Sequence, residues 1–361
     1  MHAAHQLKIG YSPSLPPMST HAPPQRDHGT TPVSTKSRNA AASHSQLPLE
    51  AFFFQGTGDA RLFGVWRDVQ LSASVDKARH VWVICPPFAE EDKSARRTLT
   101  ELCQKLQGRG EASLLFSFRG TGDSDGDFAD ATIEAWRDDV VAACREAARR
   151  APHARLCLLG VRLGASLAAL AAAEAKATRL ILIEPLLAGR PYLAAMGQRK
   201  KLRAMMTSAD SDQARSDQAR SDEKQITTAT ASIVGENGAA QATNDVVTNG
   251  VATNGEAKNG GAGDPLAVED MDGWPVAPPL CDGLNALDLA TQPPRLSPHM
   301  STHVLQVGPR AQIAASLERF ANAVNAESHA VVMRPFWNLL DYARADVLFD
   351  AIFGLQFPPD S

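Results

Sequence analysis

Short apolar runs alternate with longer amphipathic stretches over most of the chain, which indicates a βαβ arrangement. The runs suit strands that are buried on both faces of a parallel sheet. They are Val81–Cys85, Ser113–Phe118, Arg155–Gly160, Arg179–Ile183, His303–Val307 and His329–Met333. Apolar residues recur at helical spacing in Arg96–Leu106, Ile133–Ala148, Leu163–Ala175 and Ile313–Val324. The pattern therefore predicts an α/β protein with a mostly parallel, doubly wound sheet.

Two stretches contain too few large apolar side chains to form a packed core, and we expect both to be disordered. Residues 1–48 are rich in Pro, Ser, Thr and His, and residues 207–264 contain tandem SDQAR and TNG repeats. The second stretch lies in a long interruption of the βαβ rhythm, between Glu184 and Thr302, which predicts a cap insertion. The expected organisation is a tail over 1–48, a core over 49–188, a cap over 189–296 and the rest of the core over 297–361.

Composition excludes several classes of function. The 36 basic and 40 acidic residues give a formal charge of −4, so neither nucleic acid nor an anionic membrane is an expected partner. The five cysteines are scattered without a CxxC pair, as expected of buried free thiols in a reducing cytoplasm. No metal-ligand cluster, GxGxxG motif or phosphate-binding loop is present, so we expect no metal and no cofactor. Nor does the chain show a signal peptide or an apolar run of the roughly 20 residues that a membrane helix needs.

Two loops that follow predicted strands should lie at the carboxyl edge of the sheet, where open α/β sheets bind ligands. The first, Pro86–Glu91, could donate the backbone N–H of Phe88 to an oxyanion, or could be a proline-stiffened loop with a solvated acidic pair. The second, Arg119–Gly126, reads RGTGDSDG and predicts a tight turn whose glycines allow positive φ. A run of Gly, Asp and Ser is more often a turn than a catalytic loop.

A third loop has the pattern of a nucleophile elbow, GxSxG, between the strand RLCLL and an alanine-rich helix. Its middle residue is Arg162, and Leu163 would donate the second oxyanion N–H. A guanidinium stays protonated and offers only donors, so it cannot attack a carbonyl carbon. Ser166, one helical turn later, faces the wrong way, and we expect it to be a small packing residue.

The other two positions of a Ser, Asp and His relay are also changed. After the strand HVLQV the acid position reads Gly308-Pro309-Arg310, and after HAVVM the histidine position reads RPFWN. His303 and His329 lie at strand starts, on the opposite edge, where we expect a structural or exposed role. The catalytic residues are therefore unknown, and the candidate neighbours of Arg162 that could act as a base are Glu90, Glu91 and Asp123.

Several stretches taken together resemble the α/β-hydrolase-like proteins that accompany the bacterial exosortase A and exopolysaccharide system, labelled exosortase A system-associated hydrolase 2. The matching stretches are PPFAEEDKSARR, RGTGDSDGDFAD, GVRLGASLA, EPLLAGRPYL with LRAMM, DGWPVAPPL with ALDL, and PFW. The resemblance implies an α/β-hydrolase fold with a cap, and a nominal hydrolase sometimes grouped with serine aminopeptidases. It also implies a link to envelope polysaccharide and protein sorting, and an arginine at the elbow as a family trait. The long N-terminal tail and the 207–264 insertion depart from the family.

Three hypotheses for Arg162 remain open. The protein could be a hydrolase that uses another nucleophile or an activated water. It could instead be a binding or scaffold protein, since Arg162 beside a helix amino end could take a carboxylate or phosphate of a small molecule or of an envelope-assembly protein. Finally, Arg162 could pair with Glu90 or Glu91 across the two loops and close the pocket.

Overall fold

A computed structural model of the chain describes residues 49–69, 79–199, 269–271, 273–339 and 344–357, together with residues 201, 205 and 341. All of the described residues belong to one unit, Gln46–Ser361. The stretches predicted to be disordered, 1–48 and 207–264, lie outside the described residues.

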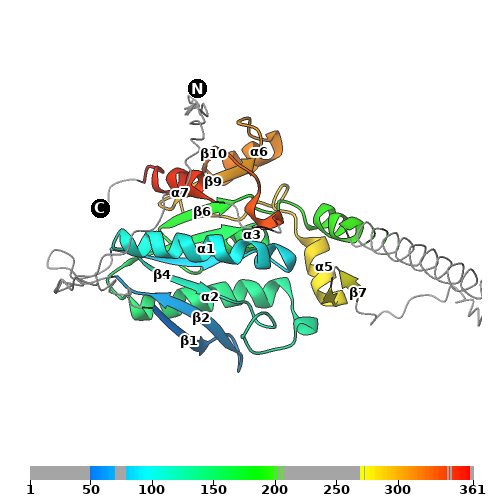
Figure 1. The fold of residues 1–361 in the computed structure, drawn as a ribbon, viewed down its shortest axis with the longest axis horizontal. Helices are drawn as coiled ribbons and strands as arrows, with labels where there is room; N and C mark the ends of the chain where they lie inside the picture. The colour runs from blue at the N-terminus through cyan, green and yellow to red at the C-terminus, as the bar shows by residue number, and fades with distance from the viewer. Residues whose placement is uncertain are drawn as a thin grey trace, which may run out of the picture. The chain divides into compact units, whose positions relative to one another are not determined.

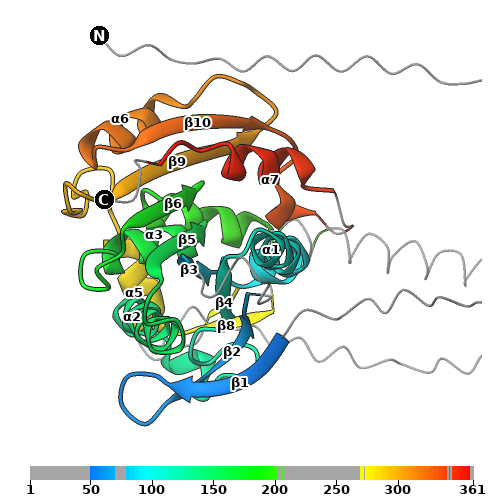
Figure 2. The same ribbon diagram turned by 90° about the vertical axis from the view of Figure 1, so that its left-hand side faces the viewer.

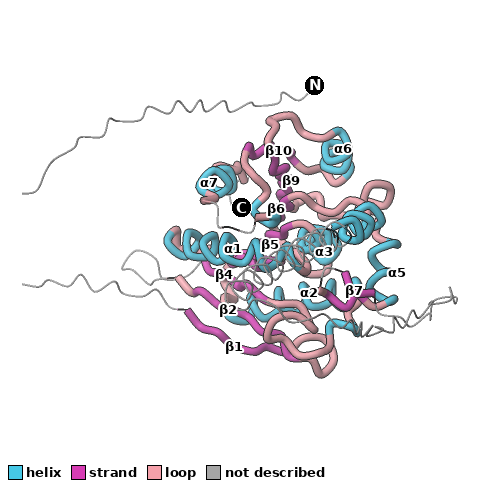
Figure 3. The backbone as a smooth tube through the Cα atoms, turned by 45° about the vertical axis from the view of Figure 1, so that its right-hand side comes forward, coloured by secondary structure: helices cyan, strands magenta, loops and turns pink. Residues whose placement is uncertain are grey.

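An eight-stranded sheet runs through this unit in the order β1-β2-β4-β3-β5-β6-β9-β10, with β1 and β10 at its edges (Figure 1, Figure 3). From β4 to β10 all neighbouring strands are parallel, whereas β1 pairs antiparallel with β2, and β2 with β4. The strands are β1 (Leu49–Gln55), β2 (Arg61–Arg67), β3 (His80–Cys85), β4 (Ala112–Phe116), β5 (Arg155–Val161), β6 (Arg179–Ile183), β9 (Ser301–Gly308) and β10 (Glu327–Val332). The predicted mostly parallel sheet is thus confirmed.

Helices cover both faces of the sheet, as the alternating pattern predicts (Figure 2). One core cluster joins the sheet to α2 (Ile133–Arg150), α3 (Leu163–Ala171) and α6 (Ala315–Ala323). A second cluster, on the other face, joins it to α1 (Glu90–Gly108) and α7 (Asp346–Phe353). Successive residues of β3 alternate between the two clusters, because a fully buried strand presents side chains to both faces.

The structure differs from the sequence pattern at both edges of the sheet. The pattern did not predict the hairpin β1–β2, in which Leu49 and Phe53 are exposed and only one residue of β1 is buried. At the other edge, β10 is not buried on both faces as expected, since most of its residues are exposed or half-buried. An edge strand lacks a neighbour on one side, so its composition is less constrained than that of a central strand.

Between β6 and β9 the chain leaves the sheet and returns. The described parts of this segment are a helix over 189–199, the hairpin of β7 (Glu269–Met271) with β8 (Trp274–Val276), and α5 (Pro278–Ala286). Leu280 and Leu284 of α5 are fully buried in the cluster that contains α2 and α3. A bridge between Ala188 and Asp288 closes the base of the segment.

None of the five cysteines forms a disulfide, and four of them are buried. Cys281, on α5, is only half-buried, which differs from the expectation of five buried thiols. Burial raises the pKa of the Cys103 thiol to about 11. Among the described helices, none has both the length and the apolar composition that crossing a bilayer requires.

Candidate functional site

The turn between β5 and α3 has the backbone of a nucleophile elbow. Arg162 adopts φ 56° and ψ −121°, a strained conformation for a residue with a side chain, and α3 begins at the next residue. A Cβ at Gly160 would lie 2.5 Å from the Cα of Ala165, and a Cβ at Gly164 would lie 2.1 Å from the carbonyl oxygen of Pro86. Both flanking glycines are therefore needed, the second because the elbow packs directly against the loop after β3.

The Arg162 side chain turns toward the β3–α1 loop and forms a charged pair with Glu91. Its Nε donates to Oε2 of Glu91 at 3.3 Å, and its Nη2 donates to Oε1 at 3.4 Å. The guanidinium also lies 5.7 Å from the ring centroid of Tyr192 and 5.4 Å from that of Trp337. Because the Arg162 side chain is 19% exposed and that of Glu91 only 3%, the pair is largely removed from water.

Glu91 is a carboxyl group in an apolar setting. Burial raises its pKa above the ordinary value, while the positive charges of Arg162 and Arg199 and the hydroxyl of Tyr192 act in the opposite direction. Burial together with the Glu91 charge raises the pKa of Tyr192. Glu91 therefore depends on its cationic neighbours to remain ionised.

Glu184, at the end of β6, is a second carboxyl group at this edge that no motif in the sequence pointed to. Its backbone has φ 45°, and its carbonyl oxygen accepts a hydrogen bond from Nη1 of Arg162 at 3.5 Å. Its Oε1 accepts from the backbone N–H of Val307 at 3.1 Å, and burial raises the pKa of the carboxyl group. The stretch EPLLAGR contains this residue, but a glutamate at a strand end is not by itself a distinctive signal.

The other two candidate bases do not join Arg162. Glu90 accepts hydrogen bonds from Nζ of Lys93 at 2.6 Å and from Nε1 of Trp274 at 3.1 Å. Asp123 is exposed, and among the described residues no hydrogen bond or ion pair connects it to Arg162 or Glu91. Of the three carboxylates that the sequence offered, only Glu91 meets the elbow residue.

The Arg119–Gly126 turn is held by structural contacts. Both carboxylate oxygens of Asp139 accept hydrogen bonds from the Nε of Arg119, and one also accepts from its backbone N–H. The hydroxyl of Ser124 donates to the carbonyl oxygen of Ser117 at 2.7 Å and accepts from the N–H of Phe63 at 2.9 Å. These contacts fasten the turn to α2 and to the neighbouring strands.

The two residues expected to donate oxyanion N–H groups lie on adjacent loops. Phe88 is buried and packs against Tyr192, Phe128 and Trp136, with centroids 5.5 to 6.2 Å away. Leu163 opens α3, where backbone N–H groups have no intrahelical acceptor. The first turn of α3 has no acidic residue, and Arg162 makes no side-chain cap.

The loops after β9 and β10, which the sequence suggested as the acid and histidine positions, carry the following residues. Gly308 ends β9 and is followed by Pro309 and Arg310, as the sequence requires. The loop after β10 forms a short 3-10 helix, η2 (Phe336–Asn338), and places the buried Trp337 beside Arg162. Ser166 is fully buried and donates to the carbonyl oxygen of Leu186 at 2.9 Å, so it packs inside the fold.

A small hollow of about 10 Å³ lies beside Glu91, between the β3–α1 loop and the segment that follows β6. It is lined by Phe88, Ala89, Glu90, Glu91, Tyr192, Met196, Arg199 and Trp274. Such a space holds about one water molecule and no larger group. The site can therefore hold a water near Glu91, and the residue at the elbow position is the Arg162 guanidinium.

Sequence comparison agrees with the topology of the sheet. The model of the family Hydrolase_4, described as serine aminopeptidase, S33, matches residues 77–249. None of the curated proteins matches the sequence significantly. Together with the eight-stranded sheet, the family match shows that the chain has the α/β-hydrolase fold and is a hydrolase-like protein of the α/β-hydrolase superfamily.

Similar solved structures include several α/β hydrolases. Est1E from Butyrivibrio proteoclasticus, with ferulic acid bound, has 14% identity and a TM-score of 0.48 over 84% of this chain and 96% of its own. An α/β serine hydrolase homologue from Coxiella burnetii has 15% identity and a TM-score of 0.40, covering 79% of this chain and 86% of its own. An α/β serine hydrolase without lid from Xanthomonas campestris has 24% identity and a TM-score of 0.34, and the match covers 38% of this chain and 62% of that one.

Proposed function

We propose that this chain is a non-hydrolytic α/β-hydrolase-fold protein that binds an anionic group at the elbow through Arg162. The observation that carries the proposal is the backbone of position 162, which has the strained elbow conformation but presents a guanidinium. The loops that would supply an acid and a histidine supply Gly308-Pro309-Arg310 and Trp337 instead. A Ser, Asp and His relay is therefore degenerate at all three positions.

The charges around the elbow favour an anion. Arg162 and Arg199 both act on Glu91, so two cations face one buried carboxylate, while Glu90 is engaged by Lys93. The uncapped amino end of α3 adds backbone N–H donors and the positive end of a helix dipole. Arg162 is held in place by Glu91 and by two aromatic rings, which reduces the entropy that an incoming carboxylate or phosphate would lose on ordering it.

We further propose that residues 189–296 are a cap and that the protein serves the exosortase and exopolysaccharide system in the cytoplasm. The matching stretches in the sequence support this link, since they include the elbow, the loop after β3 and the PFW segment that contacts Arg162. Residues of the cap also line the hollow beside Glu91, so the cap would take part in selecting the ligand. The ligand would then be an acidic small molecule or an acidic group on an envelope-assembly protein.

Anion binding is tested with inorganic phosphate and acetate as probes, measuring the melting temperature of the full chain as each is titrated. We expect both anions to stabilise the wild type, and Arg162→Gln to remove the effect because it loses the positive charge that attracts the anion. Arg162→Lys should retain only part of it, since an ammonium has fewer donors than a guanidinium that already bonds both oxygens of Glu91. Arg97→Gln, which removes an exposed cation of α1, is the matched control.

Hydrolysis is tested in parallel with nitrophenyl esters, aminoacyl anilides and a fluorophosphonate label. We expect wild type to remain unlabelled and inactive, and Arg162→Ser to stay inactive as well, because Trp337 stands where a histidine would accept the serine proton. Labelling or turnover by the wild type would overturn the proposal of a non-hydrolytic protein. Equal anion responses in wild type and Arg162→Gln would overturn the anion site.

A second candidate function is hydrolysis by a water molecule activated at Glu91. The place of this carboxyl group beside a hollow that holds about one water molecule favours it, and burial raises its pKa, which makes the carboxylate a stronger base. Turnover without fluorophosphonate labelling, abolished by Glu91→Gln, would support this mechanism.

A further inference from the structure

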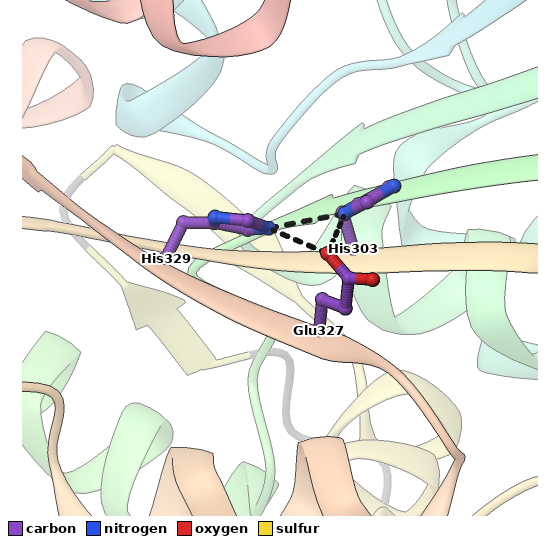
Figure 4. Close-up of side chains that lie close together, drawn as sticks. All are labelled: His303, Glu327 and His329. Carbon is purple, nitrogen blue, oxygen red and sulfur yellow. Dashed lines mark hydrogen bonds and ion pairs between the residues drawn. The ribbon is translucent and has the colours of Figure 1, made fainter. Parts of the chain in front are cut away.

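A group of ligand-type side chains lies at the amino edge of the sheet, far along the strands from the elbow. His303, near the start of β9, meets Glu327 and His329, both on β10 (Figure 4). The parallel register sets Glu327 directly beside His303. Because side chains alternate along a strand, Glu327 and His329 face the same side of β10. The fold thus gathers two imidazoles and one carboxylate on one face of the two strands.

The three nearest ligand atoms form a compact triangle. Nδ1 of His303 lies 3.0 Å from Nε2 of His329, and Oε2 of Glu327 lies 3.7 and 3.9 Å from these two nitrogens. A point about 2.1 Å from all three atoms exists inside such a triangle. Zinc forms bonds of about 2.0 to 2.2 Å with histidine nitrogen and carboxylate oxygen, so an ion fits with little movement of the side chains.

The surroundings of His303 suit a metal ligand. The second ring nitrogen of His303 lies 3.5 Å from the hydroxyl of Ser301, and the backbone of Gln356 hydrogen-bonds to the ring. Contacts of this kind orient an imidazole and select the nitrogen that is left for the metal. The ring of Phe357 packs edge-on against the same imidazole at 4.8 Å.

Exposure differs among the three residues in a way that leaves a path for an ion. The side chain of His303 is 1% exposed, that of His329 34% and that of Glu327 70%. The buried imidazole can therefore anchor the ion, while the two outer side chains close over it from the solvent side. Without an ion, one of the two facing nitrogens must carry a proton to make the 3.0 Å contact, and metal binding would require that ring to carry its proton on its other nitrogen instead.

We propose that His303, Glu327 and His329 form a binding site for a divalent transition-metal ion, with zinc as the best-fitting ion. Two imidazoles and one carboxylate are a common zinc ligand set, and a tetrahedral ion would keep its fourth position for water. The ion would join the edge strand β10 to β9. Residue spacing along the chain did not indicate this site, because the ligands come from two strands and become neighbours only through the register of the sheet.

The site is tested by titrating metal-free full-length protein with Zn²⁺ in a calorimeter. Five histidines precede residue 49 and can bind zinc weakly. The site is therefore judged from the difference in zinc stoichiometry and affinity between the wild type and each variant, not from the total zinc bound. We expect wild type to bind one more equivalent than His329→Ala, and Glu327→Gln to bind that equivalent at least about tenfold more weakly. His299→Ala, which removes an exposed histidine four residues before His303, should match the wild type.

Cobalt provides a second readout, because tetrahedral Co²⁺ gives strong visible absorption that octahedral aqueous Co²⁺ lacks. We expect this absorption in wild type and His299→Ala but not in His329→Ala, with the metal-free variants melting at similar temperatures. Identical zinc stoichiometry and affinity in wild type and His329→Ala would overturn the proposal, since the bound zinc would then lie elsewhere. His303→Ala is not used because it would leave a gap in the packing around Phe357.

Discussion

Glu91 and Arg162 follow two neighbouring parallel strands, β3 and β5, and their charged groups meet at the carboxyl edge of the sheet with Oε2 and Nε 3.3 Å apart. In an α/β hydrolase, the elbow would carry the nucleophilic serine and the loop after β3 would supply an oxyanion N–H; here Arg162 and Glu91 lie at these two places. Its members lie 71 residues apart in the sequence, and the guanidinium of Arg162 offsets part of the cost of burying the Glu91 charge. The pair therefore links the stability of the fold to the chemistry of the site.

Arg162→Ala is expected to destabilise the protein by about 3 to 5 kcal/mol at pH 7, because it leaves the buried Glu91 carboxylate without its partner. Replacing both residues with apolar ones, as in Arg162→Met with Glu91→Leu, should cost much less than Arg162→Ala alone. Urea unfolding measures both changes. The control is Arg97→Ala, whose exposed pair with Glu101 is worth about 1 kcal/mol or less. Similar costs for Arg162→Ala and Arg97→Ala would contradict a buried, interdependent pair.

The raised pKa of Glu91 predicts a pH dependence with a definite sign. Between the ordinary value of 4.5 and the raised value, the folded state binds more protons than the unfolded state, so the contribution of Glu91 to stability falls as pH rises. We therefore expect the free energy of unfolding of wild type, relative to Glu91→Gln, to decrease with pH across this window. Subtracting the variant removes the effect of Asp92, Asp139 and Glu184, whose pKa values are also raised. A relative stability that increases with pH would mean that Arg162 outweighs burial.

Gly164→Ala should prevent normal folding or reduce stability severely. The added Cβ would lie 2.1 Å from the carbonyl oxygen of Pro86 and 2.4 Å from that of Cys85, and neither backbone group can move without shifting the loop after β3. The matched control is Gly197→Ala in the helix over 189–199, where a Cβ meets nothing within 4 Å. That change should be neutral or stabilising by about 0.5 to 1 kcal/mol. Circular dichroism and thermal unfolding distinguish the two, and a stable Gly164→Ala would refute the close approach of the two loops.

Cys281 is expected to be the cysteine that reacts with a thiol reagent in the native protein. It is half-buried, whereas the other four are buried, and burial raises the pKa values of Cys85, Cys103 and Cys144. Titration with a chromogenic disulfide should give about one rapid thiol for wild type, none for Cys281→Ser, and all five after denaturation. Rapid modification of more than one thiol in the native state would indicate that the core opens readily.

The central strands were predictable from sequence because they are apolar along their whole length. Arg179–Ile183 is a strand with the predicted bounds, and the other five predicted strands match within a few residues. The sequence pattern did not reveal the hairpin β1–β2, because many of its residues are exposed and it mixes apolar with polar types. Helix α1 begins at Glu90, earlier than its apolar periodicity suggested, because its first turn is acidic.

At the site, the elbow was visible in the sequence as two glycines around one residue between a strand and a helix. The sequence predicted that Arg162 could pair with Glu90 or Glu91. It could not decide between them, because that depends on which side of helix α1 faces the elbow, and in the structure Glu91 faces it while Glu90 bonds Trp274. The roles of Trp337 and Glu184 were not visible, since a tryptophan in a loop and a glutamate at a strand end occur widely without such contacts. Contacts that depend on which strands are neighbours cannot be found from local sequence alone.

Ala89 and Arg162 share one unusual backbone conformation, φ 56° with ψ −130° and −121°, and each precedes a helix that follows one of two adjacent strands. Neither residue offers a nucleophile, so the strain in these turns is maintained by packing and does not depend on serine chemistry. The backbone of these two turns is therefore formed independently of the side chains at the site, so the chemistry of the site can be changed by replacing side chains. A designer who wished to restore or invent catalysis in this chain would keep both turns and exchange Arg162, Glu91 and Trp337 as a set.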